Sequence, residues 1–116
     1  MKNYDFNDVF DCVDLPVFIH GKDFRLIYAN PAYLSIANTA AAEALGKVYW
    51  DVFPKQETPP SSCYEATLSK SGISSRDEVS VKDRVYLSMG FIKRDADGDV
   101  VFAIHSTYTT SQNRSV

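Results

Sequence analysis

Apolar residues recur at helical spacing near the start of the chain. Phe6, Val9, Phe10 and Val13 follow the order i, i+3, i+4, i+7, which places them on one face of a helix over residues 4–13. An amphipathic helix outside a compact core often buries its apolar stripe against a partner. These four residues are therefore predicted to form a homodimer interface. The alternative is that the helix packs against the domain's own sheet.

Apolar and polar residues alternate with the period of a strand further along the chain. The predicted strands cover residues 17–20, 25–29, 76–82, 84–93 and 100–109. The side chains predicted to point inward are Val79 and Val81 of the third strand and Val85, Leu87, Met89 and Phe91 of the fourth. In the fifth strand Phe102, Ile104 and Ser106 share one face. Asp97-Gly98 is typical of the tight turn of a hairpin.

Between the second and third strands the pattern changes to short helices. Asn30 is a preferred N-cap residue and Pro31 suits the first helical position, so a helix is predicted over residues 32–36. A second short helix is predicted over residues 40–45, and the longest core helix over residues 60–70. This order of elements predicts a single antiparallel α+β domain at residues 14–110. It is flanked by the N-terminal helix at 1–13 and a polar tail or linker at 111–116.

Composition excludes several classes of partner. The net charge of −3 gives no positive surface for nucleic acid or an anionic membrane. No apolar run approaches the about 20 residues of a membrane span, and the N-terminus lacks the apolar region of a signal peptide. Cys12 and Cys63 are too few for a disulfide framework or a zinc site. The chain is therefore predicted to be cytoplasmic.

No catalytic motif stands out, so no enzymatic activity is expected. The chain has no Gly-rich phosphate loop and no paired histidine and carboxylate motif. His20 and His105 fall on different predicted strands, and His20 is interpreted as a surface or hydrogen-bonded residue, so no metal site is expected. Cys63 is interpreted as a small buried hydrophobic residue. Its place early in a helix favours a thiolate slightly, which leaves redox sensing as an alternative.

Several short motifs occur in a characteristic order. They are Leu15-Pro16, Tyr28-Ala29-Asn30-Pro31-Ala32, Leu45-Gly46-Lys47, Asp51-Val52-Phe53-Pro54 and Asp97-Gly98. With these motifs the chain resembles the PAS domain, the small sensor module of bacterial and eukaryotic signalling proteins. The resemblance implies a PAS fold: a five-stranded antiparallel sheet of order 2-1-5-4-3 with helices covering one face. It also implies a pocket between the helices and the sheet.

The resemblance allows the cofactors of the family to be considered in turn. Haem-binding oxygen sensors carry an axial His on the long helix, and residues 60–70 contain none. Light-oxygen-voltage flavin sensors carry an Asn-Cys-Arg-Phe-Leu-Gln motif, and the matching residues 49–54 contain no Cys. Photoactive yellow protein has its chromophore Cys directly after Pro54, where this chain has Lys55. No cofactor is therefore expected, and the protein should be colourless.

The resemblance implies a sensory function. The chain is expected to be the input domain of a sensor histidine kinase or a cyclic-dinucleotide enzyme, with an output domain in the same polypeptide. It is expected to form a homodimer and to bind a small molecule in its core. The predicted ligand-binding residues are Ile19, Tyr33, Trp50, Phe53, Cys63, Thr67, Val79, Leu87, Met89 and Ile104. The alternatives are a ligand-free dimerisation or protein-interaction domain, in which these residues form a filled core, and a redox or flavin sensor.

Overall fold

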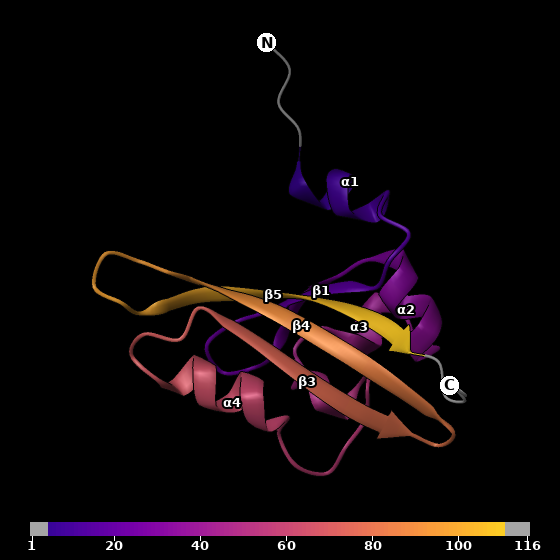
Figure 1. The fold of residues 1–116 in the computed structure, drawn as a ribbon. Helices are drawn as coiled ribbons and strands as arrows, with labels where there is room; N and C mark the ends of the chain where they lie inside the picture. Colours follow the sequence, from indigo (N-terminus) through magenta and orange to yellow (C-terminus); the bar gives the residue numbers. More distant parts are fainter. Residues whose placement is uncertain (1–4, 111–116) are drawn as a thin grey trace.

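The computed structural model describes residues 5–110, which form one sheet with helices on both of its sides (Figure 1). The helices are α1 (Phe6–Asp11), α2 (Pro31–Ala37), α3 (Ala41–Ala44), the 3-10 helix η1 (Tyr49–Asp51) and α4 (Ser61–Leu68). The strands are β1 (Val17–His20), β2 (Leu26–Ala29), β3 (Ser74–Val81), β4 (Arg84–Arg94) and β5 (Val100–Thr110). Within these residues, no helix is long and apolar enough to cross a membrane.

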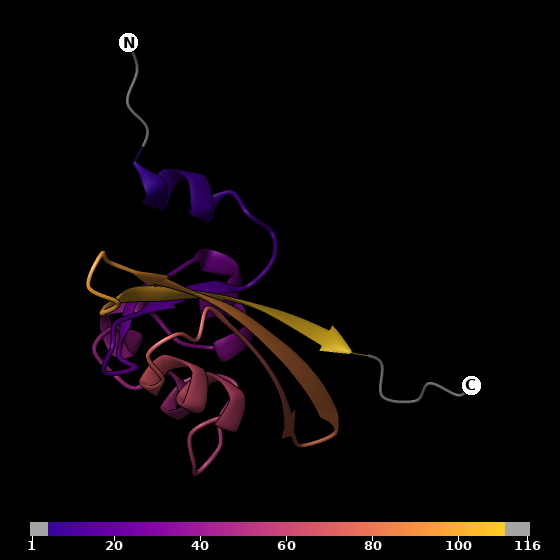
Figure 2. The same cartoon turned by 60° about the vertical axis from the view of Figure 1, so that its left-hand side comes forward.

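The sheet has the order β2-β1-β5-β4-β3, and every neighbouring pair of strands is antiparallel. This confirms the predicted fold class and strand order. Helices α3 and α4 lie on one side of the sheet, and α1 lies on the other (Figures 1 and 2). We call the side that faces α4 the inner face and the opposite side the outer face.

The predicted faces of β4 and β5 are inverted in the structure. Tyr86, Ser88 and Gly90 of β4 are buried on the inner face, together with Ala103, His105 and Thr107 of β5. The more apolar set, Leu87, Met89 and Phe91, lies on the outer face, where Phe91 is 62% exposed. The alternation was therefore recognised correctly, but the more apolar side was wrongly taken to be the buried one. Ser88, Gly90, Ala103 and Thr107 are small or polar, and they leave room above this face for large aromatic rings from β1, α2 and η1.

Those rings form the core on the inner face. Phe18 of β1 packs against Tyr33 of α2 and Tyr49 of η1, with ring centroids 5.1 and 4.7 Å apart. Phe53 packs edge-on against Tyr86 at 4.8 Å. Val79 of β3 is buried on this face as predicted. Aromatic pairs with this spacing and tilt stabilise a core beyond the area that they bury.

Asn30 is the N-cap of α2, as predicted, and its side chain also makes hydrogen bonds to β1 and to the segment around α1. Its Oδ1 accepts hydrogen bonds from the backbone N–H groups of Tyr33 and Val17, both at 2.9 Å. Its Nδ2 donates to the carbonyl oxygens of Phe10, Val13 and Leu15, at 3.1, 3.2 and 2.9 Å. One buried amide therefore joins α1, the start of β1 and the start of α2.

Helix α1 lies outside the sheet-and-helix core, and its contacts with β2 correspond to the alternative in which it packs against the domain's own sheet. It rests near the outer face, where the Tyr28 hydroxyl donates to Asp11 Oδ1 at 2.7 Å and the Phe10 and Tyr28 rings are 6.1 Å apart. Val9 is 51% exposed, and Val13 is half-buried. The side chain of Phe6 lies outside the described part of the chain. Part of the predicted apolar stripe is thus open to solvent.

Candidate functional site

The residues predicted to line a ligand pocket lie on both sides of the sheet. Those on the inner side are Tyr33, Trp50, Phe53, Cys63, Thr67 and Val79. Those on the outer face are Ile19, Leu87, Met89 and Ile104. The pairing of Ile19 with Ile104 turns both away from the inner face, because Phe18 pairs with His105 there. The ten residues therefore cannot line one pocket, and the six on the inner side belong to the packed core or lie against it.

The structure brings together three residues that the sequence analysis treated separately: His20, Cys63 and His105. The Nε2 atoms of the two histidines are 3.2 Å apart. Cys63 Sγ is 3.7 Å from His20 Nε2 and 3.5 Å from His105 Nε2. All three side chains are buried. Imidazole nitrogens and a thiol form a donor set that can hold a metal ion, and we call these residues the histidine–cysteine cluster.

The fold positions each member of the cluster from a different element. His20 ends β1, and His105 lies on the adjacent β5, where it pairs with Gly90 of β4. A Cβ atom on Gly90 would lie 2.8 and 2.9 Å from His105 ring atoms, so only glycine leaves room for this ring. Cys63 is in the first turn of α4. The Asp77 carboxylate of β3 fixes this turn, because it accepts hydrogen bonds from the backbone N–H groups of Ser62 and Cys63 at 2.8 and 2.9 Å.

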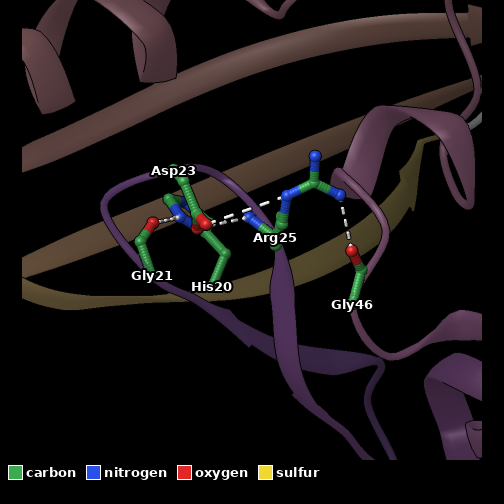
Figure 3. Close-up of polar contacts among 5 residues, drawn as sticks. All are labelled: His20, Gly21, Asp23, Arg25 and Gly46. Carbon is green, nitrogen blue, oxygen red and sulfur yellow. Dashed lines mark hydrogen bonds and ion pairs between the residues drawn. The ribbon is translucent and has the colours of Figure 1, made fainter.

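The outer ring nitrogens of both histidines have partners of their own. His20 Nδ1 donates to the Gly21 carbonyl oxygen at 2.6 Å (Figure 3), because a carbonyl can only accept. His105 Nδ1 is 3.0 Å from the Ser88 hydroxyl. A neutral His20 with its proton on Nδ1 has a free lone pair on Nε2. Both Nε2 atoms are thus directed toward each other and toward the Cys63 sulfur.

Burial sets the charge of the cluster. Loss of solvation lowers the pKa of His20 and lowers that of His105 well below its ordinary value, with the neighbouring His20 adding to the shift at His105. Burial likewise raises the pKa of the Cys63 thiol. The buried groups are therefore two neutral imidazoles and a neutral thiol at neutral pH. Neutral imidazole is the form that binds metal ions.

Aromatic rings enclose the cluster. The Tyr49 ring lies 5.1 Å from each of the His20 and His105 rings, and Phe18 stacks on His105 at 4.6 Å. The Tyr49 hydroxyl is buried and has no hydrogen-bond partner among the residues that the structure describes, although it is close enough to Cys63 for burial and the thiol to raise its pKa. The enclosure keeps water from the cluster, and the Tyr49 hydroxyl is a buried group beside it.

A surface cleft lies beside the turn that follows His20. It has a volume of about 510 Å³, and its lining includes Lys22 and Asp23 of the turn after His20 and Thr67 of α4. The Thr67 hydroxyl is 3.8 Å from Cys63 Sγ. Arg25 braces the turn, because it donates to the Gly46 carbonyl at 2.7 Å and lies 3.8 Å from the Asp23 carboxylate (Figure 3).

The pairing of the two histidines was missed because they are 85 residues apart in the sequence. A signal was nevertheless present. The strand order implied by the PAS resemblance makes the first and fifth strands neighbours, so a histidine on each can meet its counterpart. The interpretation of His20 as a surface residue is wrong in one respect, since His20 is fully buried, but its alternative as a hydrogen-bonded residue is confirmed.

These features of the fold agree with the family that the sequence matches. A family model described as PAS fold matches residues 10–115. The chain belongs to the PAS-fold family, whose members are generally sensory modules. No curated protein matches the sequence.

Solved structures of similar fold include several PAS and light-oxygen-voltage domains. An RNA-binding light-oxygen-voltage receptor is 17% identical with a TM-score of 0.71, over 93% of this chain and 33% of that one. The PAS domain of Bordetella pertussis BvgS is 18% identical with a TM-score of 0.60, over 91% and 83%. A Rhodobacter sphaeroides LOV protein is 13% identical with a TM-score of 0.70, over 96% and 68%. The chain thus spans about a third of the length of the first of these proteins.

Proposed function

We propose that this domain is the sensory input module of a larger signalling protein, either a sensor histidine kinase or a cyclic-dinucleotide enzyme, acting in the cytoplasm. In this proposal it has no catalytic activity of its own, binds a small ligand on the inner side of the sheet, and works as a homodimer. Membership of the PAS-fold family supports the sensory part. The ligand, the dimer and the output domain are parts of the proposal.

The observation that carries the proposal is the apolar outer face of the sheet. This dimer face consists of Leu87, Met89, Phe91, Phe102, Ile104 and Tyr108, which share one side of β4 and β5. Phe91 is 62% exposed and Tyr108 is 41% exposed, while the others are half-buried. A contiguous apolar surface of this kind is typical of an interaction site. Helix α1, with its exposed Val9, lies on the same side of the sheet (Figures 1 and 2).

The position of the dimer face supports a second copy of the chain as the partner. In a two-fold symmetric dimer each copy contributes the same surface, which suits a self-complementary apolar patch. The face also lies directly behind the candidate ligand site, because Ile104 and Ser106 flank His105 on β5 and point the other way. A change at the inner side of β5 therefore has a direct physical route to the dimer contact.

A ligand-free dimerisation domain is a second candidate function, and one observation favours it. The inner residues predicted to line a pocket pack against one another, with Tyr33 contacting Phe53 and Phe53 contacting Tyr86. In that case the dimer face alone would carry the function. Native mass spectrometry of the purified chain distinguishes the two, because a co-purifying ligand supports sensing and an unliganded dimer supports assembly.

The dimer is tested by placing a charge in the middle of the face. Phe91→Glu should convert a dimer into a monomer in sedimentation velocity, since a buried unpaired carboxylate is costly. Leu68→Glu is the matched control, because Leu68 is a similarly exposed apolar residue on α4, at 59%. A wild-type monomer at all accessible concentrations, or a Phe91→Glu variant that stays dimeric, would contradict the proposal.

A further inference from the structure

The donor atoms of the histidine–cysteine cluster are separated as a tetrahedral zinc ion requires. Zinc binds imidazole nitrogen at about 2.0–2.1 Å and thiolate sulfur at about 2.3 Å, so tetrahedral angles give N···N and N···S separations of about 3.3 and 3.6 Å. The cluster shows an N···N separation of 3.2 Å and N···S separations of 3.5 and 3.7 Å. We propose that His20, Cys63 and His105 form a binding site for a zinc ion, and that this ion is the ligand of the domain.

The contacts around the cluster are those of a prepared metal site. A metal-binding histidine usually donates its other ring N–H to a nearby oxygen, which fixes the ring and its tautomer. His20 does this to the Gly21 carbonyl, and Ser88 provides the corresponding oxygen for His105. Gly90 supplies the space that allows the His105 ring to lie where its Nε2 meets that of His20.

The protons and charges of the binding step can all be accounted for. The Cys63 S–H bond breaks as the Zn–S bond forms, and the proton leaves to solvent, as metal binding by a thiol requires. Where His105 carries its proton on Nε2, that proton shifts to Nδ1, and the resulting Nδ1–H donates a hydrogen bond to Ser88 Oγ. The zinc–thiolate pair carries one net positive charge. The buried Asp77 carboxylate, bonded to the N–H of Cys63 itself, lies on the same side and offsets that charge.

Three protein ligands leave a fourth position on the ion. Zinc sites with an open position take water or an exchangeable group there. The buried Tyr49 hydroxyl lies close enough to Cys63 for each group to shift the pKa of the other, which makes it the polar group to examine next to the ion.

A metal-free arrangement of the same atoms is the competing explanation. The Ser88 hydroxyl would donate to His105 Nδ1, His105 Nε2–H would donate to His20 Nε2, and His20 Nδ1–H would donate to the Gly21 carbonyl. This chain of hydrogen bonds accounts for the two histidines. It does not explain why Cys63 Sγ lies at nearly equal distances from both Nε2 atoms, whereas a shared zinc ion does.

The test uses the purified 116-residue chain after treatment with a chelator. Cobalt(II) is titrated in first as a spectroscopic probe, and zinc is then added to displace it. We expect one cobalt per chain, with the visible bands of tetrahedral cobalt and a thiolate-to-metal charge-transfer band. Cys63→Ser should lose the charge-transfer band. Cys12→Ser should keep the charge-transfer band, because Cys12 is exposed and is not a member of the histidine–cysteine cluster.

Two further measurements guard against loss of folding in the Cys63 variant. Ser88→Ala removes only the outer partner of His105 and should weaken zinc binding by about 10–100-fold with the fold intact by circular dichroism. Zinc should also raise the melting temperature of the wild type and of Cys12→Ser. The proposal is overturned if the wild type binds no cobalt or zinc at micromolar concentration, or if the charge-transfer band persists in Cys63→Ser.

The zinc site gives the proposed sensory function a specific ligand. Only the role of the ion as the signal depends on that proposed function, and the binding of zinc does not. Sedimentation of the same samples separates the two. Zinc binding without any dimer would leave the metal site standing and overturn the dimeric sensor. A dimer that binds neither zinc nor cobalt would overturn the zinc site and leave the dimer proposal intact.

Discussion

Replacing Asn30 should destabilise the domain far more than the loss of a helix cap. An N-cap contributes typically about 1 kcal/mol, so a residue with that role alone should lose about this amount on mutation to alanine. Asn30 has no exposed surface, and its side chain makes five hydrogen bonds to three different elements. Alanine removes all of them at once.

The expected magnitude follows from what is left unpaired. The Tyr33 N–H at the start of α2 loses its cap, which costs about 1 kcal/mol. The Val17 N–H at the start of β1 is left buried without a partner, which costs a further about 1–3 kcal/mol. The carbonyls of α1 and its linker are only part-buried, so water can replace much of their loss. Asn30→Ala should therefore lower the free energy of unfolding by about 2–4 kcal/mol.

Urea unfolding followed by far-UV circular dichroism measures this difference. Ser35→Ala is the matched control, since Ser35 is exposed on the same helix. Asn30→Asp separates the two halves of the role. Aspartate is as good an N-cap as asparagine, so it should be neutral if capping is all that matters. We expect it to be strongly destabilising, because its second oxygen would face the carbonyls of Phe10, Val13 and Leu15.

Two results would refute this reasoning. One is an Asn30→Ala variant within about 1 kcal/mol of the wild type, which would reduce Asn30 to a simple cap. The other is an Asn30→Asp variant as stable as the wild type, which would show that the donor half of the amide contributes nothing. Hydrogen exchange adds a local check, because α1 should lose protection in both variants if the amide anchors it.

Three further predictions address the rest of the molecule. Gly90→Ala should push the His105 ring aside and cost about 1–3 kcal/mol in urea unfolding, whereas the Gly21→Ala control should cost less; equal effects would argue against the close contact. Arg94→Lys should lose the bonds to three backbone carbonyls around the end of α4, at about 1.5–3 kcal/mol, and α4 amides should exchange faster; unchanged exchange would contradict this role. Val9→Glu should weaken the dimer in sedimentation without lowering the stability of the monomer, since Val9 is 51% exposed, and an unchanged dimer would exclude α1 from the interface.

Much of the fold follows from local signals in the sequence. Asn30-Pro31 correctly predicted the start of α2. Gly46 was predicted to terminate the second short helix in a left-handed conformation, and it follows α3 with φ of +92°. The strand order came from the family resemblance rather than from the residues, because pairing between distant strands leaves no local signal. The helix predicted at residues 60–70 is present as Ser61–Leu68.

The faces of β4 show where the sequence was misleading. Alternation divides a strand into two sets, and apolarity normally selects the buried set. Here Ser88 and Gly90 are inside because the inner face must accommodate the His105 ring, while Leu87 and Met89 face outward. The candidate site could not be predicted for the same reason: it depends on which residues of separate strands become neighbours, and on a glycine whose importance lies in the space that it leaves.

The alternation of roles along β5 has an evolutionary consequence. The side chains of Ala103, His105 and Thr107 are buried on the inner face. Those of Ile104 and Ser106, which alternate with them, lie on the outer face. Insertion or deletion of a single codon within this strand would exchange the two sets, moving His105 into solvent and Ile104 into the core. The hairpin at residues 95–99 lies outside this constraint. Related genes should therefore differ in length at the hairpin and hold a fixed length from Val100 to the end of the strand.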